Sequence, residues 1–214
     1  MSLQGIKIGL AITGSHCTMD KMFIQLENLC SAGALIYPII SPAVRNTNTR
    51  YGGAKILREK VEAITGNNII EEIVDAEPVG PQKLFDVIAI APCTGNTLAK
   101  LANGISDTAV LMAAKAQLRN QRPVVLSIAT NDGLGINAKN IGILLAAKNI
   151  FMVPFGQDDP VQKPNSLVSQ MDLLPLTIEK ALKKEQVQPL LVCNSSSSVK
   201  EEKNPYVQNK YCGN

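Results

Sequence analysis

Residues 86–91 read DVIAIA, a short apolar run of the kind found in strands that are buried on both faces of a sheet. Small and polar residues follow at once in 92–97 (PCTGNT), and apolar residues then recur at helical spacing over 98–105. A buried strand, a polar turn and a helix in that order form the repeating unit of parallel α/β folds. This segment therefore predicts the fold class.

The same unit recurs along the chain. Four more apolar runs have the length of strands: 6–13 (IKIGLAIT), 35–40 (LIYPII), 124–129 (VVLSIA) and 150–153 (IFMV). Because Pro38 cannot donate a backbone hydrogen bond, the second run is expected near an edge of the sheet. Helical spacing predicts helices at 22–30, 56–64, 98–105, 110–118, 141–148 and 167–182. The alternation implies an α/β, three-layer Rossmann-like (flavodoxin-like) fold with a central parallel sheet and helices on both faces.

Composition narrows the function classes. The chain has 214 residues, 45% apolar and 18% charged, so we expect one globular domain over 1–192 and a polar, mobile tail over 193–214. A formal net charge of +3 is too small to indicate nucleic acid or an anionic membrane as a partner. No apolar run reaches the ~18–20 residues that span a bilayer, and the N-terminus lacks a signal-peptide pattern, which favours the cytoplasm.

Histidine and cysteine limit the chemistry. His16 is the single histidine, so it is either a proton donor or acceptor in the site or a residue that only caps or packs. The five cysteines are widely spaced and include no C-x-x-C pair, which argues against a disulfide framework and a structural zinc. We predict no metal site. Cys93 fits a packed core thiol better than a reactive thiolate.

Small polar residues follow every predicted strand. These turns are 13–16 (TGSH), 41–43 (SPA), 92–97 (PCTGNT), 130–133 (TNDG) and 154–159 (PFGQDD). Strand-to-helix turns are usually polar, so one such turn means little. Since the carboxyl ends of parallel strands share one edge, where open α/β sheets bind ligands, the five turns together predict a ligand site there.

Two of these turns favour an anion. Gly14 and Ser15 precede one helix, and Gly95, Asn96 and Thr97 open another, so free backbone N–H groups and the helix dipole would attract a phosphate or carboxylate. Neither turn matches the G-x-G-x-x-G or G-x-x-x-x-G-K-[ST] pattern. One phosphate on a planar cofactor therefore fits better than a dinucleotide or a triphosphate. Asn96 is the strongest candidate, because its amide can both donate and accept.

At these turns the sequence resembles the homo-oligomeric flavin-containing decarboxylase family. The likeness rests on Thr13-Gly14-Ser15 and on 91–104 (APCTGNTLAKLANG), where the family has Pro-Ala-Ser-Ala-Asn-Thr, and it extends over roughly residues 5–192. The resemblance implies a flavin mononucleotide (FMN) site shared between the subunits of a trimer. By position, the phosphate would be held by Gly14, Ser15 and Ser41, and the rest of the cofactor would lie near Thr94, Gly95, Asn96, Thr97 and Asn131.

Other stretches, including 47–50 (TNTR), 111–116 (LMAAKA) and 153–158 (VPFGQD), resemble one component of an enzyme that oxidises dihydrodipicolinate to dipicolinate in the mother cell of spore-forming bacteria. This likeness implies a partner protein that carries NADP, and this chain lacks a nicotinamide-binding motif of its own. The small dicarboxylate substrate is a planar dianion. Arg45 and Arg50 either clamp its carboxylates or are solvated loop residues.

Three departures separate the chain from the decarboxylases. Residues 128–131 (IATN) replace a Pro-x-Met-Asn motif, residues 94–96 (TGN) replace Ser-Ala-Asn, and no counterpart of the late catalytic-cysteine segment precedes the tail. The main expectation is therefore an oxidoreductase subunit that is active only with its partner. Two alternatives stay open: a flavin-dependent decarboxylase of a cysteinyl carboxylate, and a non-catalytic binding or scaffold subunit that has lost the cofactor.

Overall fold

The computed structural model describes residues 3–48 and 53–193. Within them, seven strands form one sheet: β1 (Lys7–Ile12), β2 (Leu35–Ile40), β3 (Val87–Thr94), β4 (Val124–Thr130), β5 (Ile150–Met152), β6 (Phe155–Asp159) and β7 (Lys163–Ser169). The α-helices are α1 (Met19–Ser31), α2 (Pro42–Asn46), α3 (Ala54–Thr65), α4 (Ile73–Ala76), α5 (Gly95–Ala102), α6 (Ala109–Arg119), α7 (Ala138–Leu145) and α8 (Leu174–Leu182). Short 3-10 turns are η1 (His16–Thr18), η2 (Glu77–Val79) and η3 (Met171–Leu173).

The sheet combines a parallel part with an antiparallel hairpin. Strands β2, β1, β3, β4 and β5 are parallel neighbours in that order. The outer side of β4 is shared, because its first half pairs with β5 while Ala129 and Thr130 pair with β7 in the antiparallel sense. Strand β6 then pairs with β7. The predicted parallel core is confirmed, and β2, which contains Pro38, lies at the end of the order as expected.

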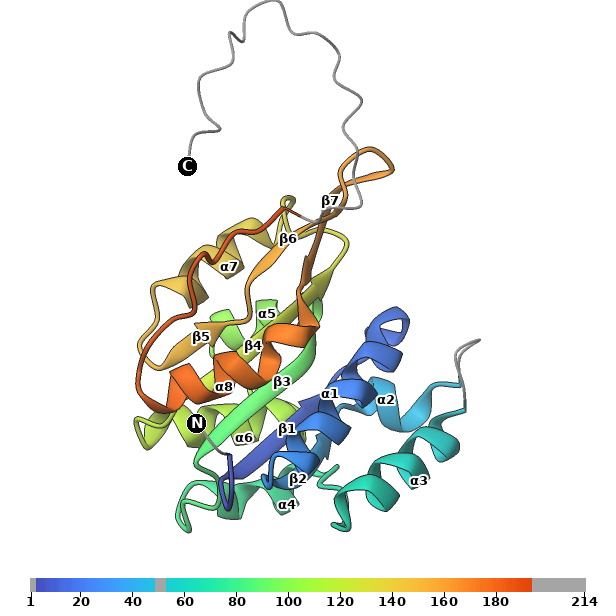
Figure 1. Cartoon of the computed structure of the whole chain (residues 1–214), viewed down its shortest axis with the longest axis vertical. Helices are drawn as coiled ribbons and strands as arrows, with labels where there is room; N and C mark the ends of the chain where they lie inside the picture. The colour runs from blue at the N-terminus through green and yellow to red at the C-terminus, as the bar shows by residue number, and fades with distance from the viewer. Residues whose placement is uncertain (1–2, 49–52, 194–214) are drawn as a thin grey trace, which may run out of the picture.

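Helices cover both faces of the sheet, as predicted (Figure 1). Helices α1, α3 and α8 contribute to one apolar cluster, and α4, α5, α6 and α7 contribute to the other. Strand β3 supplies both clusters by alternation: Val87 and Ala89 belong to the first, and Ile88 and Ile90 to the second. All four side chains are fully buried, which explains why DVIAIA is a nearly continuous apolar run.

The C-terminal third differs from the prediction in one place. Residues 154–159 were expected as a turn and 167–182 as one helix, but residues 155–159 and 163–169 form the β6–β7 hairpin. The helix α8 begins only at Leu174, after the short turn η3. The apolar spacing misled because Leu167 and Met171 are buried in the interior like Leu174, although the three residues lie in three different kinds of local structure.

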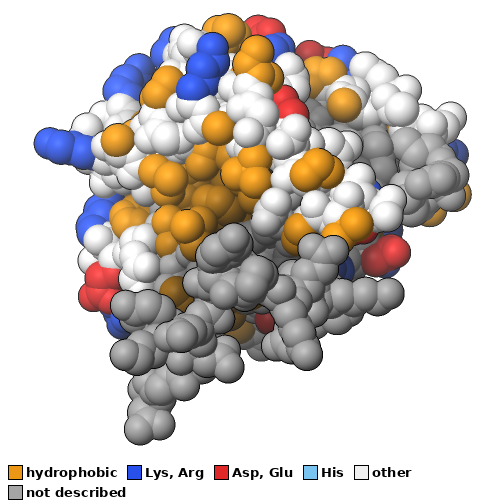
Figure 2. Space-filling view, turned by 90° about the horizontal axis from the view of Figure 1, so that it is seen from above, with side chains coloured by type: hydrophobic (Ala, Val, Ile, Leu, Met, Phe, Trp, Pro, Cys, Tyr) orange, Lys and Arg blue, Asp and Glu red, His pale blue; other side chains and the backbone are white. Residues whose placement is uncertain are grey.

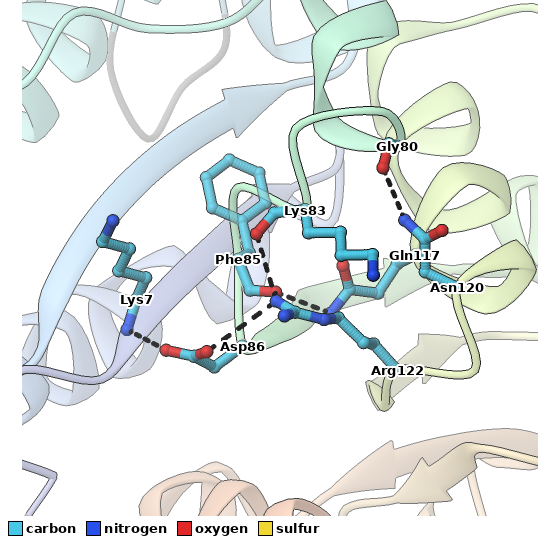
Figure 3. Close-up of polar contacts among 8 residues, drawn as sticks. All are labelled: Lys7, Gly80, Lys83, Phe85, Asp86, Gln117, Asn120 and Arg122. Carbon is cyan, nitrogen blue, oxygen red and sulfur yellow. Dashed lines mark hydrogen bonds and ion pairs between the residues drawn. The ribbon is translucent and has the colours of Figure 1, made fainter.

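A polar clamp holds the edge of the sheet where the parallel strands begin (Figure 3). The Arg122 guanidinium donates to the backbone carbonyls of Lys83 and Phe85 and lies 3.7 Å from a carboxylate oxygen of Asp86. The Gln117 side chain donates to the same Phe85 carbonyl at 3.3 Å, and Asn120 donates to the Gly80 carbonyl at 2.7 Å. The clamp thus fixes the chain that leads into β3.

Candidate functional site

A cavity of about 720 Å³ opens at the carboxyl edge, the edge of the sheet where β1, β3 and β4 end. A volume of this size suits a cofactor or a small substrate. Its lining residues are Gly14, Ser15, Cys17, Thr18, Lys21, Thr94, Gly95, Asn96, Ala129, Thr130, Asn131, Asp132, Asn137, Asp158, Lys163, Ser166, Leu167 and Val168. The turns after β1, β3 and β4 thus meet in one place.

Six of the residues expected from the sequence line this cavity together: Gly14, Ser15, Thr94, Gly95, Asn96 and Asn131. The amide side chains of Asn96 and Asn131 are exposed to the cavity and hydrogen-bond no other residue of the described chain. Each therefore has a donor and an acceptor available for a ligand.

Thr97 and Arg45 are not among the lining residues. Thr97 is buried, and its hydroxyl is 3.1 Å from that of Thr94. Arg45 forms an ion pair with Glu72. His16 begins η1, but the description does not extend to its side chain, and Arg50 lies outside the described residues.

Threonine side chains fix the start of α5. The hydroxyl of Thr13 donates to the Pro92 carbonyl at 2.7 Å and accepts from the Thr94 N–H at 3.0 Å. The hydroxyl of Thr94 in turn accepts from the Thr97 N–H at 3.4 Å, as an N-cap residue does. These bonds tie the first turn of α5 to the end of β1, and they place Asn96 at the cavity.

Asp132 organises the opposite wall. One of its carboxylate oxygens accepts from the Thr130 hydroxyl at 2.5 Å, and the two oxygens accept from the Asn137 amide at 2.8 and 2.9 Å. These two donors lower the pKa of Asp132, Thr130 having the larger effect. Asn140 donates to the buried Asn137 at 2.8 Å and so continues the network behind the wall.

This network also explains why glycine stands at position 95. A Cβ atom there would lie 2.5 Å from the Thr130 hydroxyl and 2.7 Å from the Asn137 amide nitrogen. The family resemblance places alanine at this position, so the departure follows from the polar side chains that fill the space in this chain. The start of the helix and the polar wall are therefore in direct contact.

Ser41 lies at the same edge, although it is not among the lining residues. It follows β2, and its backbone N–H donates to the Ile12 carbonyl at 3.0 Å, next to the turn that carries Gly14 and Ser15. Its hydroxyl is buried and has no hydrogen-bond partner in the described chain. A buried hydroxyl without a partner is costly, and an anionic ligand that accepts its hydrogen bond would remove that cost.

The β6–β7 hairpin adds lining residues, of which Asp158 belongs to the predicted turn 154–159, whereas Lys163, Ser166 and Leu167 were not predicted. Asp158 of β6 and Lys163 of β7 line the cavity and form an ion pair at 3.0 Å, and Ser166 and Leu167 of β7 line it as well. Lys21, from the first turn of α1, and Cys17 were also not predicted. The place of Lys163 at this edge depends on the antiparallel pairing of β7 with β6 and β4, which no local sequence pattern indicates.

Cys93 has the structural role favoured by the sequence. It is fully buried in the cluster under α5 and α6, and burial raises the pKa of its thiol far above its ordinary range. Within residues 3–48 and 53–193, no three His, Cys, Asp or Glu side chains are grouped as metal ligands. No helix of this part of the chain is long and apolar enough to cross a membrane.

The fold and the cavity define a class: α/β proteins that bind a ligand in the crevice at the carboxyl ends of parallel strands. The chain belongs to the Flavoprotein family, whose profile matches residues 1–173. The family resemblance inferred from the turns is thereby confirmed.

Individual relatives agree with this placement. The chain is 54% identical over 193 residues to the B subunit of dipicolinate synthase from Bacillus subtilis (strain 168), covering 90% of this chain and 96% of that protein. The crystal structure of the corresponding B subunit from Bacillus halodurans C is 47% identical, with a TM-score of 0.83 over 90% of this chain and 99% of that one. AnUbiX (PadA1) in complex with FMN and dimethylallyl pyrophosphate shares the fold, at 20% identity and a TM-score of 0.58 over 71% and 78% of the two chains.

Proposed function

We propose that this chain is a subunit of dipicolinate synthase, which oxidises dihydrodipicolinate to dipicolinate during sporulation, in the cytoplasm of the mother cell. The observation that carries the proposal is 54% identity, spread over nearly the full length of both chains, to the B subunit of dipicolinate synthase. The likeness to a decarboxylase structure such as SpaF is a likeness of fold alone, at 19% identity. The decarboxylase alternative has no comparable support.

The reaction removes a hydride and a proton from the dihydropyridine ring and leaves an aromatic dicarboxylate. The hydride needs an acceptor, and we assign that role to NADP on the A subunit of dipicolinate synthase. A partner of this kind is consistent with the absence of a dinucleotide fingerprint in this chain. The chain is then an oxidoreductase subunit whose activity depends on its partner.

FMN fits the cavity by the chemistry of the residues present. The partnerless hydroxyl of Ser41, with Gly14 and Ser15 beside it, would hold the phosphate. The available amides of Asn96 and Asn131 would meet the donor and acceptor edge of the ring system. When bound, FMN supplies a group that can accept and return a hydride. This chain's own residues orient the ring and hold the charge.

A homo-oligomer, which we take to be trimer-based, is supported by exposed apolar side chains near the cavity. Leu134 and Ile136 are 50% and 73% exposed, and they belong to the turn whose Asn131, Asp132 and Asn137 line the cavity. Figure 2 shows apolar side chains gathered around a hollow on the molecule's upper face, which carries α7 and the β6–β7 hairpin in Figure 1. Contact with another copy would bury such side chains.

The test is turnover of dihydrodipicolinate by the A subunit with NADP⁺, with and without this chain, together with an FMN titration read by absorbance. We expect the chain to raise the rate and to perturb the flavin spectrum. In the variant Asn96→Ala, FMN affinity should fall while the melting temperature is unchanged. Asn28→Ala is the matched control, because Asn28 lies near the far end of α1.

The outcomes separate the alternatives. If the chain has no effect on the rate, it is not a subunit of this enzyme. If the chain raises the turnover rate but does not bind FMN, it is a subunit of the oxidoreductase that works without a flavin. Release of carbon dioxide from a cysteinyl carboxylate, without dihydrodipicolinate turnover, would replace the proposal with the decarboxylase reading.

A further inference from the structure

The substrate of the proposed reaction carries two carboxylates, and the cavity must supply cations to hold them. The lining residues include four ionisable groups of opposite charge: Lys21, Lys163, Asp132 and Asp158. Arg45, one of the two arginines considered as a clamp for the carboxylates, is paired with Glu72 and is not in the lining, and Arg50 lies outside the described residues. Among the described residues, the positive charges that line the cavity are therefore those of the two lysines.

The two lysines are not equivalent. Lys163 of β7 is already paired with Asp158 at 3.0 Å, and this carboxylate raises the pKa of Lys163. Lys21 forms no ion pair with any residue of the described chain, yet it lines the cavity from the first turn of α1. The two carboxylates already have partners within the chain: Asp158 pairs with Lys163, and Asp132 accepts hydrogen bonds from Thr130 and Asn137.

We propose that Lys21 binds one carboxylate of the pyridine dicarboxylate substrate, an inference that rests on the proposed function. Lys21 is a binding residue and not a catalytic one. An ammonium group on a flexible four-carbon chain can reach a ligand in a broad cavity, and its interaction with a carboxylate is stronger than a neutral hydrogen bond. Ser15 and Thr18, from the turn after β1 and from η1, line the same cavity and add hydroxyl groups to it.

A flavin phosphate is the other anion that this lysine can meet, because both ligands present anionic oxygens. The carboxylate is favoured by the surroundings of Lys21. Gly14 and Ser15, which we assign to the phosphate, line the same cavity as Lys21, but the partnerless hydroxyl of Ser41 lies outside the lining, toward β2. Lys21 instead shares the cavity with the hairpin residues Asp158 and Lys163, on the side opposite β2 in the sheet order.

The experiment measures ligand binding to the full chain by calorimetry. The probes are dipicolinate and pyridine-2,6-dicarboxamide, a neutral analogue of the same shape, and separately FMN and riboflavin, which differ by the phosphate. The variants are Lys21→Gln, Lys21→Arg and Lys148→Gln. Lys148 is an exposed lysine just before β5, at the opposite edge of the sheet, so it controls for the loss of one positive charge.

We expect Lys21→Gln to weaken dipicolinate binding roughly tenfold and to leave the dicarboxamide unaffected, since the lost interaction is with a charge. Lys21→Arg should keep most of the affinity, and Lys148→Gln should behave as the unmodified chain. Melting temperatures of all variants verify that they fold. The same loss should appear as a raised KM in the turnover assay with the A subunit, with kcat nearly unchanged.

Two results would overturn the inference. One is an unchanged affinity of Lys21→Gln for dipicolinate. If this variant then binds FMN more weakly but riboflavin as well as the unmodified chain does, Lys21 is assigned to the phosphate instead. The other is an unmodified chain that does not bind dipicolinate. Failure of the proposed function is recognised separately, because it is the absence of any effect of the unmodified chain on the turnover rate of the A subunit.

Discussion

Several polar side chains of the site hydrogen-bond one another and so hold a fixed geometry. Asp132 is the clearest case, because Thr130 and Asn137 both donate to it and Gly95 leaves the space that they occupy. The carboxylate is thereby kept ionised and aimed along the wall of the cavity. A charged group held by fixed donors is a preorganised element of a site, since it need not reorient when a ligand binds.

Asn137→Ala tests this arrangement through the pKa of Asp132. Removal of the amide donor should raise that pKa toward its ordinary value, although Thr130 will still hold it partly down. Because the folded-state pKa lies below the unfolded one, the ionised carboxylate stabilises the fold above the unfolded pKa, and this contribution disappears as the pH falls through the folded pKa. The variant should therefore lose roughly 1–3 kcal/mol at neutral pH and lose less in acid.

The measurements are a carbon-13 carboxyl titration by NMR and urea unfolding at several pH values. Asn103→Ala is the control, because Asn103 lies at the far end of the same network, 3.5 Å from Asn140, and does not touch Asp132. An Asp132 pKa that is the same in Asn137→Ala and in the unmodified chain would contradict this account.

At the scale of elements, strand-to-helix connections decide where the site residues stand. Strand β3 runs directly into α5 without an intervening loop, and the hydroxyls of Thr13 and Thr94 satisfy the backbone groups at that junction. The position of Asn96 depends on this first turn. Helix α6 starts in the same way, with the Thr108 hydroxyl accepting from the Leu111 N–H at 3.3 Å, but it supplies no lining residue.

The pair Thr94→Val and Thr108→Val separates capping from site placement. Each variant loses its N-cap hydrogen bond and so roughly 1 kcal/mol of the free energy of unfolding, as read by urea denaturation. Thr94→Val loses in addition the hydroxyl contacts with Thr97 and Thr13, so its loss should be the larger one. Only Thr94→Val should also weaken FMN binding, because only that cap lies beside Asn96. Equal FMN affinities in the two variants would show that the cap does not position the site.

Elements also show how far sequence alone predicts this protein. The parallel strands and their helices follow from apolar runs and helical spacing, because most of the apolar side chains in these patterns are buried, although Ile56 and Ile105 are exposed. The hairpin escapes such reasoning: β6 ends in two aspartates and β7 begins with Lys163, Pro164 and Asn165, residues that are rare in strands. The pairing of Arg45 with Glu72 escapes it too, because the partners are 27 residues apart.

At the scale of the whole molecule, the edge where the parallel strands begin and the edge where they end differ in structure. The edge where the parallel strands begin is closed by the Arg122 clamp (Figure 3), while the carboxyl edge is open and polar. The end of the described chain reinforces the open side. Residues 186–192 return to the sheet, where the Gln186 side chain bonds the backbone of Met152 and the Phe155 N–H donates to the Leu190 carbonyl at 3.0 Å.

Two truncations locate the end of the folded domain. Removal of 194–214, which are mostly polar, should leave the melting temperature within about 2 °C, in keeping with our proposal that the domain ends near 192. Removal from 187 onward deletes the buried Val187 and the backbone hydrogen bonds that join Leu190 and Val192 to Phe155. It should therefore lower the melting temperature by several degrees, at ~2–4 °C per kcal/mol for a chain of this size. Both are measured by thermal unfolding of the truncated chains. A large fall in the shorter truncation would place stabilising contacts in 194–214, and no further fall in the longer one would mean that β6 holds the cavity wall without the returning segment.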